Sequence, residues 1–223
     1  MRGGIMFSMQ QSWFDDSDGF DIALRWRESP DGEVFELIVN GMFAMDSVDA
    51  SSELELARLA PPASRRVLVG GLGLGFTAGD LLDRLPDAAV TVAELSSALI
   101  GWAREGIVPG LARVAQDPRA TLWHVDVAEA LRTTSDWDAI LLDVDNGPGF
   151  LIHDSNATLY GGSLLSAARD ALAPGGLLAI WCENATPSLD AALRELGGDV
   201  WQVEVPVERD GHQITYAIHC LRR

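Results

Sequence analysis

An apolar strand that runs directly into a glycine-rich turn constrains the fold of this sequence most. Residues 67–75 read VLVGGLGLG, in which apolar residues give way to glycine at Gly71, Gly73 and Gly75. Glycine lets the backbone pass close to a ligand because no Cβ stands in the way. A helix-like segment begins at Phe76. The pattern predicts a nucleotide-binding turn between a strand and a helix, and a tight turn without a ligand is the alternative reading.

The chain from residue 63 to residue 223 repeats this alternation of short apolar runs and helical segments. Such alternation is typical of a parallel sheet with crossover helices. The last two strand-like runs are joined by only four residues, 208–211, and so short a connection requires an antiparallel pair. We therefore expect an α/β domain with a mostly parallel seven-stranded sheet and an antiparallel terminal hairpin. The expected strands are 67–71, 89–95, 120–126, 138–145, 176–183, 199–207 and 212–221, and the expected helices are 76–85, 96–105, 127–133, 163–172 and 189–196.

Residues 1–62 form a separate small element in this interpretation. Alternating polar and apolar residues and turn residues within 20–45 predict a β-hairpin with a short third strand. Ser52 and Glu55 fit a capping box, which predicts a helix that ends near Ala60, before two prolines.

Three acidic residues stand at the ends of consecutive predicted strands, namely Glu94, Asp126 and Asp143. The carboxyl ends of parallel strands meet at one edge of the sheet, where open α/β sheets bind ligands. Glu94 follows Gly75 by 19 residues, a spacing at which a carboxylate accepts hydrogen bonds from both hydroxyls of a ribose. Each acid has a structural alternative: Asp126 fits a helix N-cap, and Asp143 fits an acid held by loop backbone.

Other nucleotide and metal sites fit the sequence less well. Residues 73–78 formally match a dinucleotide fingerprint, but no hydride-transfer residues follow, and a P-loop is excluded because no Gly-Lys-Ser/Thr follows the glycines. The four histidines and two cysteines lack metal-ligand spacing, so we expect no metal site.

The glycine turn, the strand-end acids and the segment DAILLDVDNGPG, in this order, resemble the Rossmann-like class I S-adenosylmethionine-dependent methyltransferase fold. More narrowly they resemble the spermidine synthase family of aminopropyltransferases, over most of the chain. The resemblance implies that the adenosyl donor is held by Gly71, Gly73, Gly75, Glu94, Leu95, Asp126, Val127 and Asp143. It also implies that Asp143 removes a proton from the attacking amine. The other candidate catalytic residues, which would orient the acceptor or line its pocket, are Asp145, Asn146 and Tyr160.

Departures from the family pattern fall mainly on the acceptor side. The glycine run lacks the family's aspartate, Asn146 replaces a second aspartate, and Ala44 and a segment with Glu53 and Glu55 replace the N-terminal signature. We therefore expect methyl transfer from S-adenosylmethionine to a small amine-like nucleophile. Aminopropyl transfer from decarboxylated S-adenosylmethionine and nucleotide binding without catalysis are the alternatives.

The charge and composition of the chain restrict the classes of molecule that the protein is expected to bind. The formal net charge of -17 repels nucleic acid and anionic membranes and favours a cationic small acceptor. No run approaches the about 18 apolar residues that span a bilayer. Cys182 and Cys220 lie in apolar runs, which predicts buried thiols and a cytoplasmic protein. The hairpin in 20–45 either forms a homodimer surface, as in the resembled family, or covers the sheet edge.

Overall fold

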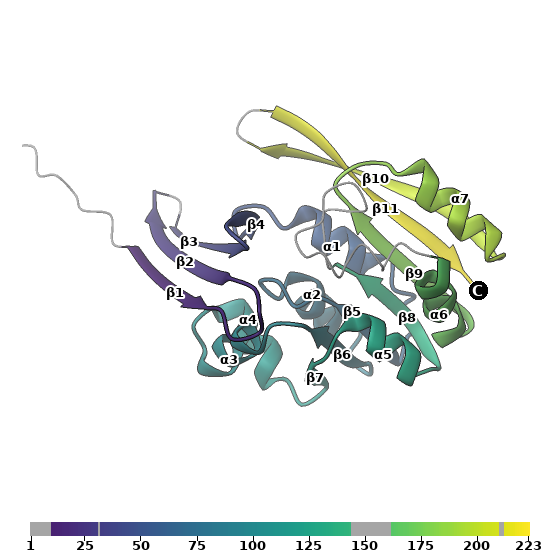
Figure 1. Cartoon of the computed structure of the whole chain (residues 1–223), viewed down its shortest axis with the longest axis horizontal. Coiled ribbons are helices and arrows are strands. Elements are labelled where there is room, and N and C mark those ends of the chain that lie inside the picture. The colour runs from purple at the N-terminus through teal and green to yellow at the C-terminus, as the bar shows by residue number, and fades with distance from the viewer. Residues whose placement is uncertain (1–9, 31, 144–161, 210–211) are drawn as a thin grey trace, which may run out of the picture.

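The computed structural model describes residues 10–30, 32–143, 162–209 and 212–223, and it contains two sheets (Figure 1). The large sheet has seven strands in the order β10-β11-β9-β8-β5-β6-β7. Its strands are β5 (Arg66–Gly70), β6 (Ala89–Glu94), β7 (Ala120–His124), β8 (Trp137–Leu142), β9 (Leu172–Cys182), β10 (Asp199–Arg209) and β11 (His212–Arg222). β5 to β9 pair in parallel, whereas β11 is antiparallel to both β9 and β10. The predicted α/β sheet with its antiparallel terminal hairpin is confirmed.

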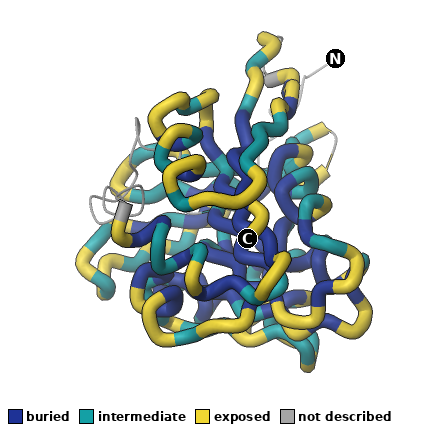
Figure 2. The backbone as a smooth tube through the Cα atoms, turned by 90° about the vertical axis from the view of Figure 1, so that its right-hand side faces the viewer, coloured by how far each residue is buried: buried dark blue, intermediate teal, exposed yellow. Residues whose placement is uncertain are grey.

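Helices cover both faces of this sheet because its strands are apolar on both sides. They are α1 (Ser51–Arg58), α2 (Phe76–Arg84), α3 (Ser97–Glu105), α4 (Pro109–Gln116), α5 (Val127–Thr133), α6 (Gly162–Ala171) and α7 (Pro187–Glu195). Val67 and Val69 of β5 share one buried cluster with α1 to α4, while Leu68 between them joins the cluster of α5 to α7 on the other face. Figure 2 shows buried backbone running through the interior between exposed outer segments. The sheet is therefore the middle of three layers.

The N-terminal element is a four-stranded antiparallel sheet in the order β1-β2-β3-β4. Its strands are β1 (Gln10–Asp15), β2 (Ile22–Ser29), β3 (Gly32–Val39) and β4 (Met42–Asp46). Leu24 and Leu37 belong to the same buried cluster as α1 to α4, so the small sheet packs on that face of the large one. The carboxylate of Asp18 accepts hydrogen bonds from the backbone N–H (2.7 Å) and the hydroxyl (2.9 Å) of Ser97, which holds the β1–β2 turn at the start of α3.

Several local predictions are corrected by the structure. The capping box is wrong: α1 begins at Ser51 with Ala50 as N-cap and no side-chain cap, and the Ser52 hydroxyl donates instead to Glu53 at 2.6 Å. β1 and α4 were not predicted, because β1 is a largely exposed edge strand and α4 begins at Pro109 in a stretch that resembles a turn. β9 starts at Leu172 rather than residue 176, where its pairing with β8 shifts register.

The two cysteines, Cys182 and Cys220, are buried free thiols, as predicted. Burial raises the pKa of the Cys220 thiol to about 12, so it stays protonated and unreactive near neutral pH.

Candidate functional site

The glycine-rich turn joins β5 to α2 at the carboxyl edge of the large sheet (Figure 1). Gly71, Gly73 and Gly75 have φ angles of 91°, 51° and 87°, in the left-handed region that favours glycine. The Gly71 N–H donates to the carbonyl of Ala93 on β6 at 2.9 Å, and Gly75 is the N-cap of α2. The backbone is thus turned tightly at a helix N-terminus, a position that suits a polar or anionic group of a ligand.

The small N-terminal sheet contacts this turn through Met45 of β4. A Cβ at Gly73 would lie 2.7 Å from Met45 Sδ, and the Leu74 N–H donates to the same sulfur at 3.3 Å. The backbone conformation at position 73 therefore favours glycine, and a Cβ there would require the Met45 side chain to move.

Glu94, at the end of β6, holds the turn in place. Its Oε2 accepts the Leu72 N–H at 2.8 Å and its Oε1 accepts the Ser96 N–H at 2.7 Å. The residue is 8% exposed, and burial raises the pKa of Glu94 while these N–H groups oppose the rise. A backbone hydrogen bond from Leu95 also lowers the pKa of Glu94. A carboxylate has about four lone-pair sites, so the group can accept these three N–H groups and still accept a hydrogen bond from a ribose hydroxyl.

The predicted residues around the third strand lie beside Glu94. The carbonyl of Leu95 is 3.0 Å from Nε2 of His124, and Asp126 is the N-cap of α5, where its Oδ1 accepts the Ala128 N–H at 2.7 Å. Val127 is buried. The structural alternative for Asp126 is thus observed, and its adenine-side role stays a prediction.

Asp143 follows β8 and lies next to the glycine turn. Its N–H donates to the carbonyl of Gly70 at 2.9 Å, and its Oδ2 accepts the hydroxyl of Thr77, on α2, at 2.9 Å. Burial and the charge of Glu53 raise the pKa of Asp143 to about 7, against the opposing Thr77 hydrogen bond. A carboxyl group with this pKa is suited to accept a proton near neutral pH.

Glu53, which the sequence analysis noted only as a departure, is part of the same site. It lies on α1 and is 9% exposed, and its carboxylate accepts the Ser52 hydroxyl. The sequence carried a signal: Glu53 occupies the apolar stripe of α1 at helical spacing from Leu56, Ala57 and Ala60, where a charged side chain is out of place. Two carboxyl groups that are 90 residues apart in the sequence therefore lie close enough for the charge of Glu53 to raise the pKa of Asp143.

The remaining catalytic candidates, Asp145, Asn146 and Tyr160, lie outside the described residues. Within residues 10–30, 32–143, 162–209 and 212–223 no group of three or more His, Cys, Asp or Glu is arranged to hold a metal ion. His219 is buried instead: its Nδ1 pairs with Asp190 at 2.7 Å and its Nε2 accepts the Thr186 N–H at 3.2 Å. In the same described part, no helix combines the length and apolar character needed to cross a membrane.

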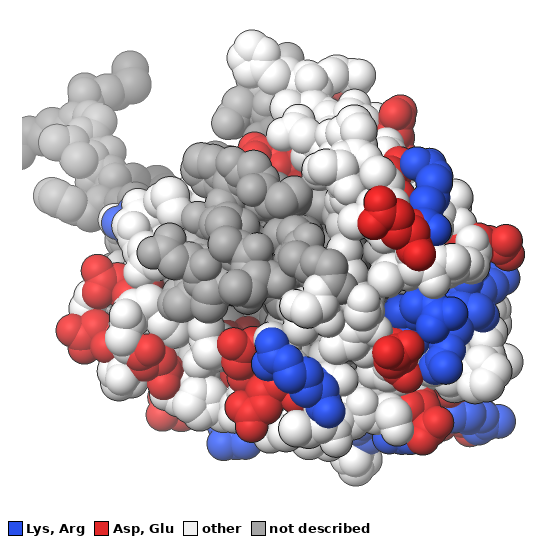
Figure 3. Space-filling model, turned by 45° about the vertical axis from the view of Figure 1, so that its right-hand side comes forward, with Lys and Arg blue, Asp and Glu red and all other residues white. Residues whose placement is uncertain are grey.

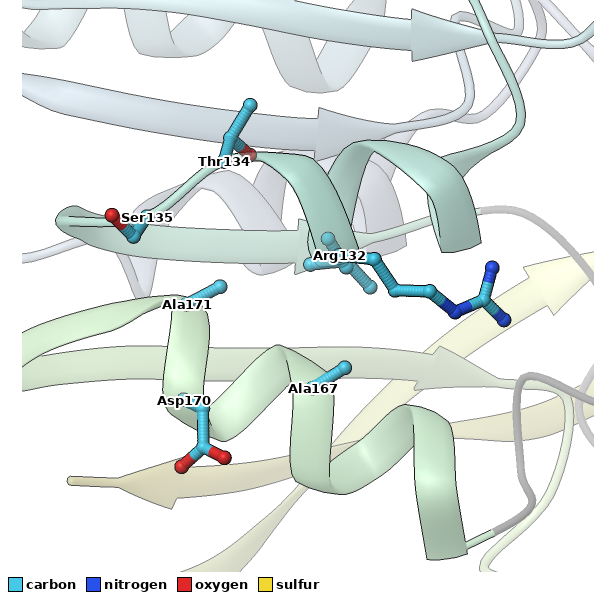
Figure 4. Close-up of a pocket in the computed structure, with 7 residues that line it drawn as sticks. Arg132, Thr134, Ser135, Ala167, Asp170 and Ala171 are labelled. Carbon is cyan, nitrogen blue, oxygen red and sulfur yellow. The ribbon is translucent and has the colours of Figure 1, made fainter.

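A surface hollow of about 370 Å³ lies between α5 and α6, lined by Arg132, Thr134 and Asp170 among others (Figure 4). It sits near the C-terminal ends of both helices, where β8 begins, and so at the opposite edge of the sheet from the glycine turn. None of the predicted ligand-binding residues lines it. We therefore assign the candidate site to the carboxyl edge.

Acidic side chains are spread over the face shown in Figure 3, whereas arginine side chains gather toward one side of it. This distribution agrees with the net charge of -17 and favours a cationic or neutral ligand over a polyanion.

Comparison with known proteins identifies the family. The methyltransferase small domain family matches residues 36–216. A polyamine aminopropyltransferase of Corynebacterium efficiens is 28% identical over 205 residues, which are 86% of this chain and 38% of that protein. A ribosomal RNA small subunit methyltransferase C of Erwinia tasmaniensis is 31% identical over 86 residues, which are 39% of this chain and 25% of that protein. The chain thus spans less than half the length of either curated relative.

Solved structures show the same fold. A spermidine synthase in complex with the transition state analogue AdoDATO superposes with a TM-score of 0.70 at 19% identity, covering 97% of this chain and 71% of that one. A spermidine synthase from Thermotoga maritima also gives 0.70, at 18% identity, covering 96% of this chain and 72% of that one. The spermidine synthase-like fold predicted from the sequence is confirmed. The chain belongs to the methyltransferase small domain family.

Proposed function

We propose that this protein transfers a methyl group from S-adenosylmethionine to the nitrogen of a small cationic amine. The observation that carries the proposal is the pair of carboxyl groups, Asp143 and Glu53, beside a glycine turn that Glu94 anchors. An ammonium ion near two acids is stabilised by their charge, and an amine must lose a proton before it attacks carbon.

Each residue of the site has its own role in the proposed reaction. Glu94 and the N–H groups of the turn bind the adenosyl part of the donor, as the left-handed glycines and the free lone pairs of the carboxylate allow. S-adenosylmethionine, when bound, supplies a methyl group on a sulfonium that is its own leaving group. Asp143 accepts a proton from the ammonium form of the acceptor, and the neutral amine then forms the N–C bond as the C–S bond breaks with its electron pair on sulfur. Thr77 fixes the Asp143 carboxylate, and Glu53 holds the remaining positive charge.

Aminopropyl transfer from decarboxylated S-adenosylmethionine is the second candidate, and the aminopropyltransferase of Corynebacterium efficiens supports it. The residues between the glycines favour methyl transfer instead. Leu72 and Leu74 are buried apolar side chains, so the turn itself offers no carboxylate to the cationic aminopropyl tail of the decarboxylated donor.

We further propose a cytoplasmic protein that divides at residue 62 into an N-terminal unit (1–62) and a donor-binding unit (63–223). Exposed Phe14 and Phe43 on the small sheet support a homodimer through that sheet. The net charge of -17 argues against nucleic acid as the acceptor.

The product of the donor tests the function. Purified protein is incubated with each donor and a panel of small amines, and the nucleoside product is identified by mass spectrometry. S-adenosylhomocysteine from S-adenosylmethionine is expected; methylthioadenosine from the decarboxylated donor would instead establish aminopropyl transfer. Asp143→Asn should abolish most turnover, and Asp170→Asn, a change in the surface hollow, should not.

A further inference from the structure

Asp18, in the turn between β1 and β2, connects the small sheet to the carboxyl edge of the large one. Its Oδ2 accepts the backbone N–H of Ser97 at 2.7 Å and the Ser97 hydroxyl at 2.9 Å. The Asp18 side chain is 17% exposed, so these bonds are largely shielded from water. Figure 1 shows the β1–β2 connection reaching α3, of which Ser97 is the first residue. A carboxylate of the small sheet is thus fixed at the start of α3.

The second oxygen of this carboxylate faces the end of β7. Asp18 Oδ1 is 3.5 Å from Nε2 of His124, the last residue of β7. The same nitrogen lies 3.0 Å from the carbonyl oxygen of Leu95, and because that oxygen can only accept, Nε2 carries the hydrogen and donates to it. The segment 95–97 is therefore bonded at one end by His124 and at the other by Asp18.

The segment 95–97 directly follows Glu94, the predicted ribose-binding acid. The Ser96 N–H donates to Glu94 Oε1 at 2.7 Å, and a backbone hydrogen bond from Leu95 also reaches the carboxylate. The other oxygen, Oε2, accepts the Leu72 N–H of the glycine turn at 2.8 Å. The position of segment 95–97 thus sets the direction in which the remaining lone pairs of Glu94 point.

The contact with Asp18 is additional to the ordinary cap of α3. The N-cap is Ser96, whose hydroxyl oxygen accepts the Leu99 N–H at 3.1 Å. This cap lies within the segment and α3, so it does not hold the segment against the rest of the protein. The bonds from Asp18 come from a residue 79 positions earlier in the chain, in the separate small sheet. They fix where the segment lies, whereas the cap only completes the helix.

Resting on the proposed transferase function, we propose that Asp18 is a positioning residue for the ribose of the donor. Asp18 fixes segment 95–97, the segment orients the Glu94 carboxylate, and this carboxylate accepts hydrogen bonds from the ribose hydroxyls. A hydrogen bond weakens steeply when its distance or angle departs from the preferred range. Loss of Asp18 should therefore weaken recognition of the ribose hydroxyls and leave the contacts with the rest of the nucleoside in place.

The test compares S-adenosylhomocysteine with its 2′-deoxy analogue, which lacks one ribose hydroxyl. Calorimetry gives the affinity of the full chain for each, and the ratio of the two affinities measures what the 2′-hydroxyl contributes. A hydrogen bond to a charged group gives a ratio of about tenfold to a hundredfold for the wild type. In Asp18→Ala this ratio should fall about fivefold to tenfold. A merely structural loss of stability would lower both affinities together and leave the ratio unchanged.

Three further variants complete the comparison. Asp18→Asn is the rescue variant, because an amide oxygen can still accept the Ser97 N–H, and its ratio should stay within about twofold of the wild type. Asp83→Ala is the matched control, because it makes the same substitution in an exposed carboxylate that pairs with Arg113 at 2.6 Å, and it should leave the ratio unchanged. Ser97→Ala removes only the hydroxyl bond and carries the test if Asp18→Ala does not fold. Its ratio should fall about twofold to threefold.

An unchanged ratio in Asp18→Ala, or in Ser97→Ala where that variant carries the test, would overturn the inference. Equal affinities of the wild type for the two nucleosides would do the same, and so would a fall in Asp83→Ala as large as that in Asp18→Ala. Turnover measurements on the same samples separate the two proposals. A lowered ratio in Asp18→Ala without turnover of any amine refutes methyl transfer alone, whereas turnover with an unchanged ratio refutes the role of Asp18 alone. Absent binding of both nucleosides refutes both.

Discussion

Gly73 offers the sharpest test of how the glycine turn is built. Gly73→Ala should destabilise the protein in two ways. The left-handed backbone (φ 51°) costs a residue with a Cβ about 1–2 kcal/mol. The new Cβ would also lie 2.7 Å from Met45 Sδ, so the thioether must move and release the Leu74 N–H, which adds about 0.5–1 kcal/mol.

Gly41→Ala is the matched control, because Gly41 has φ 74° and nothing within 4 Å of the position of its Cβ. For a chain of this size 1 kcal/mol corresponds to about 2–4 °C in Tm, so Gly41→Ala should lower Tm by roughly 2–8 °C and Gly73→Ala by about 1–4 °C more. Calorimetry and urea unfolding measure both, and the excess should disappear in a Met45→Ala background. S-adenosylhomocysteine affinity should fall in Gly73→Ala only. The reasoning is refuted if the two substitutions cost the same, or if the excess survives without Met45.

Other predictions concern the acids. The pKa of Asp143 in the folded protein is raised to about 7. Its contribution to stability is therefore present below the pKa of the unfolded state and is lost as the pH rises through 7. In scanning calorimetry, Asp143→Asn should raise Tm at pH 8 but not at pH 4. Turnover should rise with pH, with a midpoint at about 7. Glu53→Gln should move this midpoint to lower pH, because the substitution removes a charge that raises the pKa of Asp143. An unmoved midpoint in a pH–rate profile would disprove the coupling. Asp126→Ala should destabilise the protein by about 1 kcal/mol in urea unfolding through loss of the α5 N-cap, whereas Asp126→Asn, which can still cap, should be nearly neutral.

The sequence predicts the large sheet well because local patterns determine it. Apolar runs of strand length, helical spacing between them and one short final connection are each visible within a few residues, and together they give the observed topology. The small sheet was predicted less completely, because β1 exposes most of its residues and has no apolar alternation.

The candidate site, too, was predicted only in part. Glu94 and the glycines are close in sequence to the elements that position them, so the spacing alone located them. The contribution of Glu53 depends on how the fold places α1 relative to Asp143, a relation between residues 90 positions apart, as the effect of Glu53 on the pKa of Asp143 indicates. The predicted N-cap at Ser52 is wrong because the Ser52 hydroxyl donates to the Glu53 carboxylate instead.

The contact of Met45 with the Leu74 N–H joins two parts of the chain that are otherwise separate sheets. Linkage is reciprocal: whatever free energy the docked small sheet adds to donor affinity, the bound donor adds to the docking of the small sheet. Hydrogen exchange in β2 and β3 should consequently slow when the donor binds. The N-terminal strands would then report occupancy of a site that the small sheet contacts through Met45.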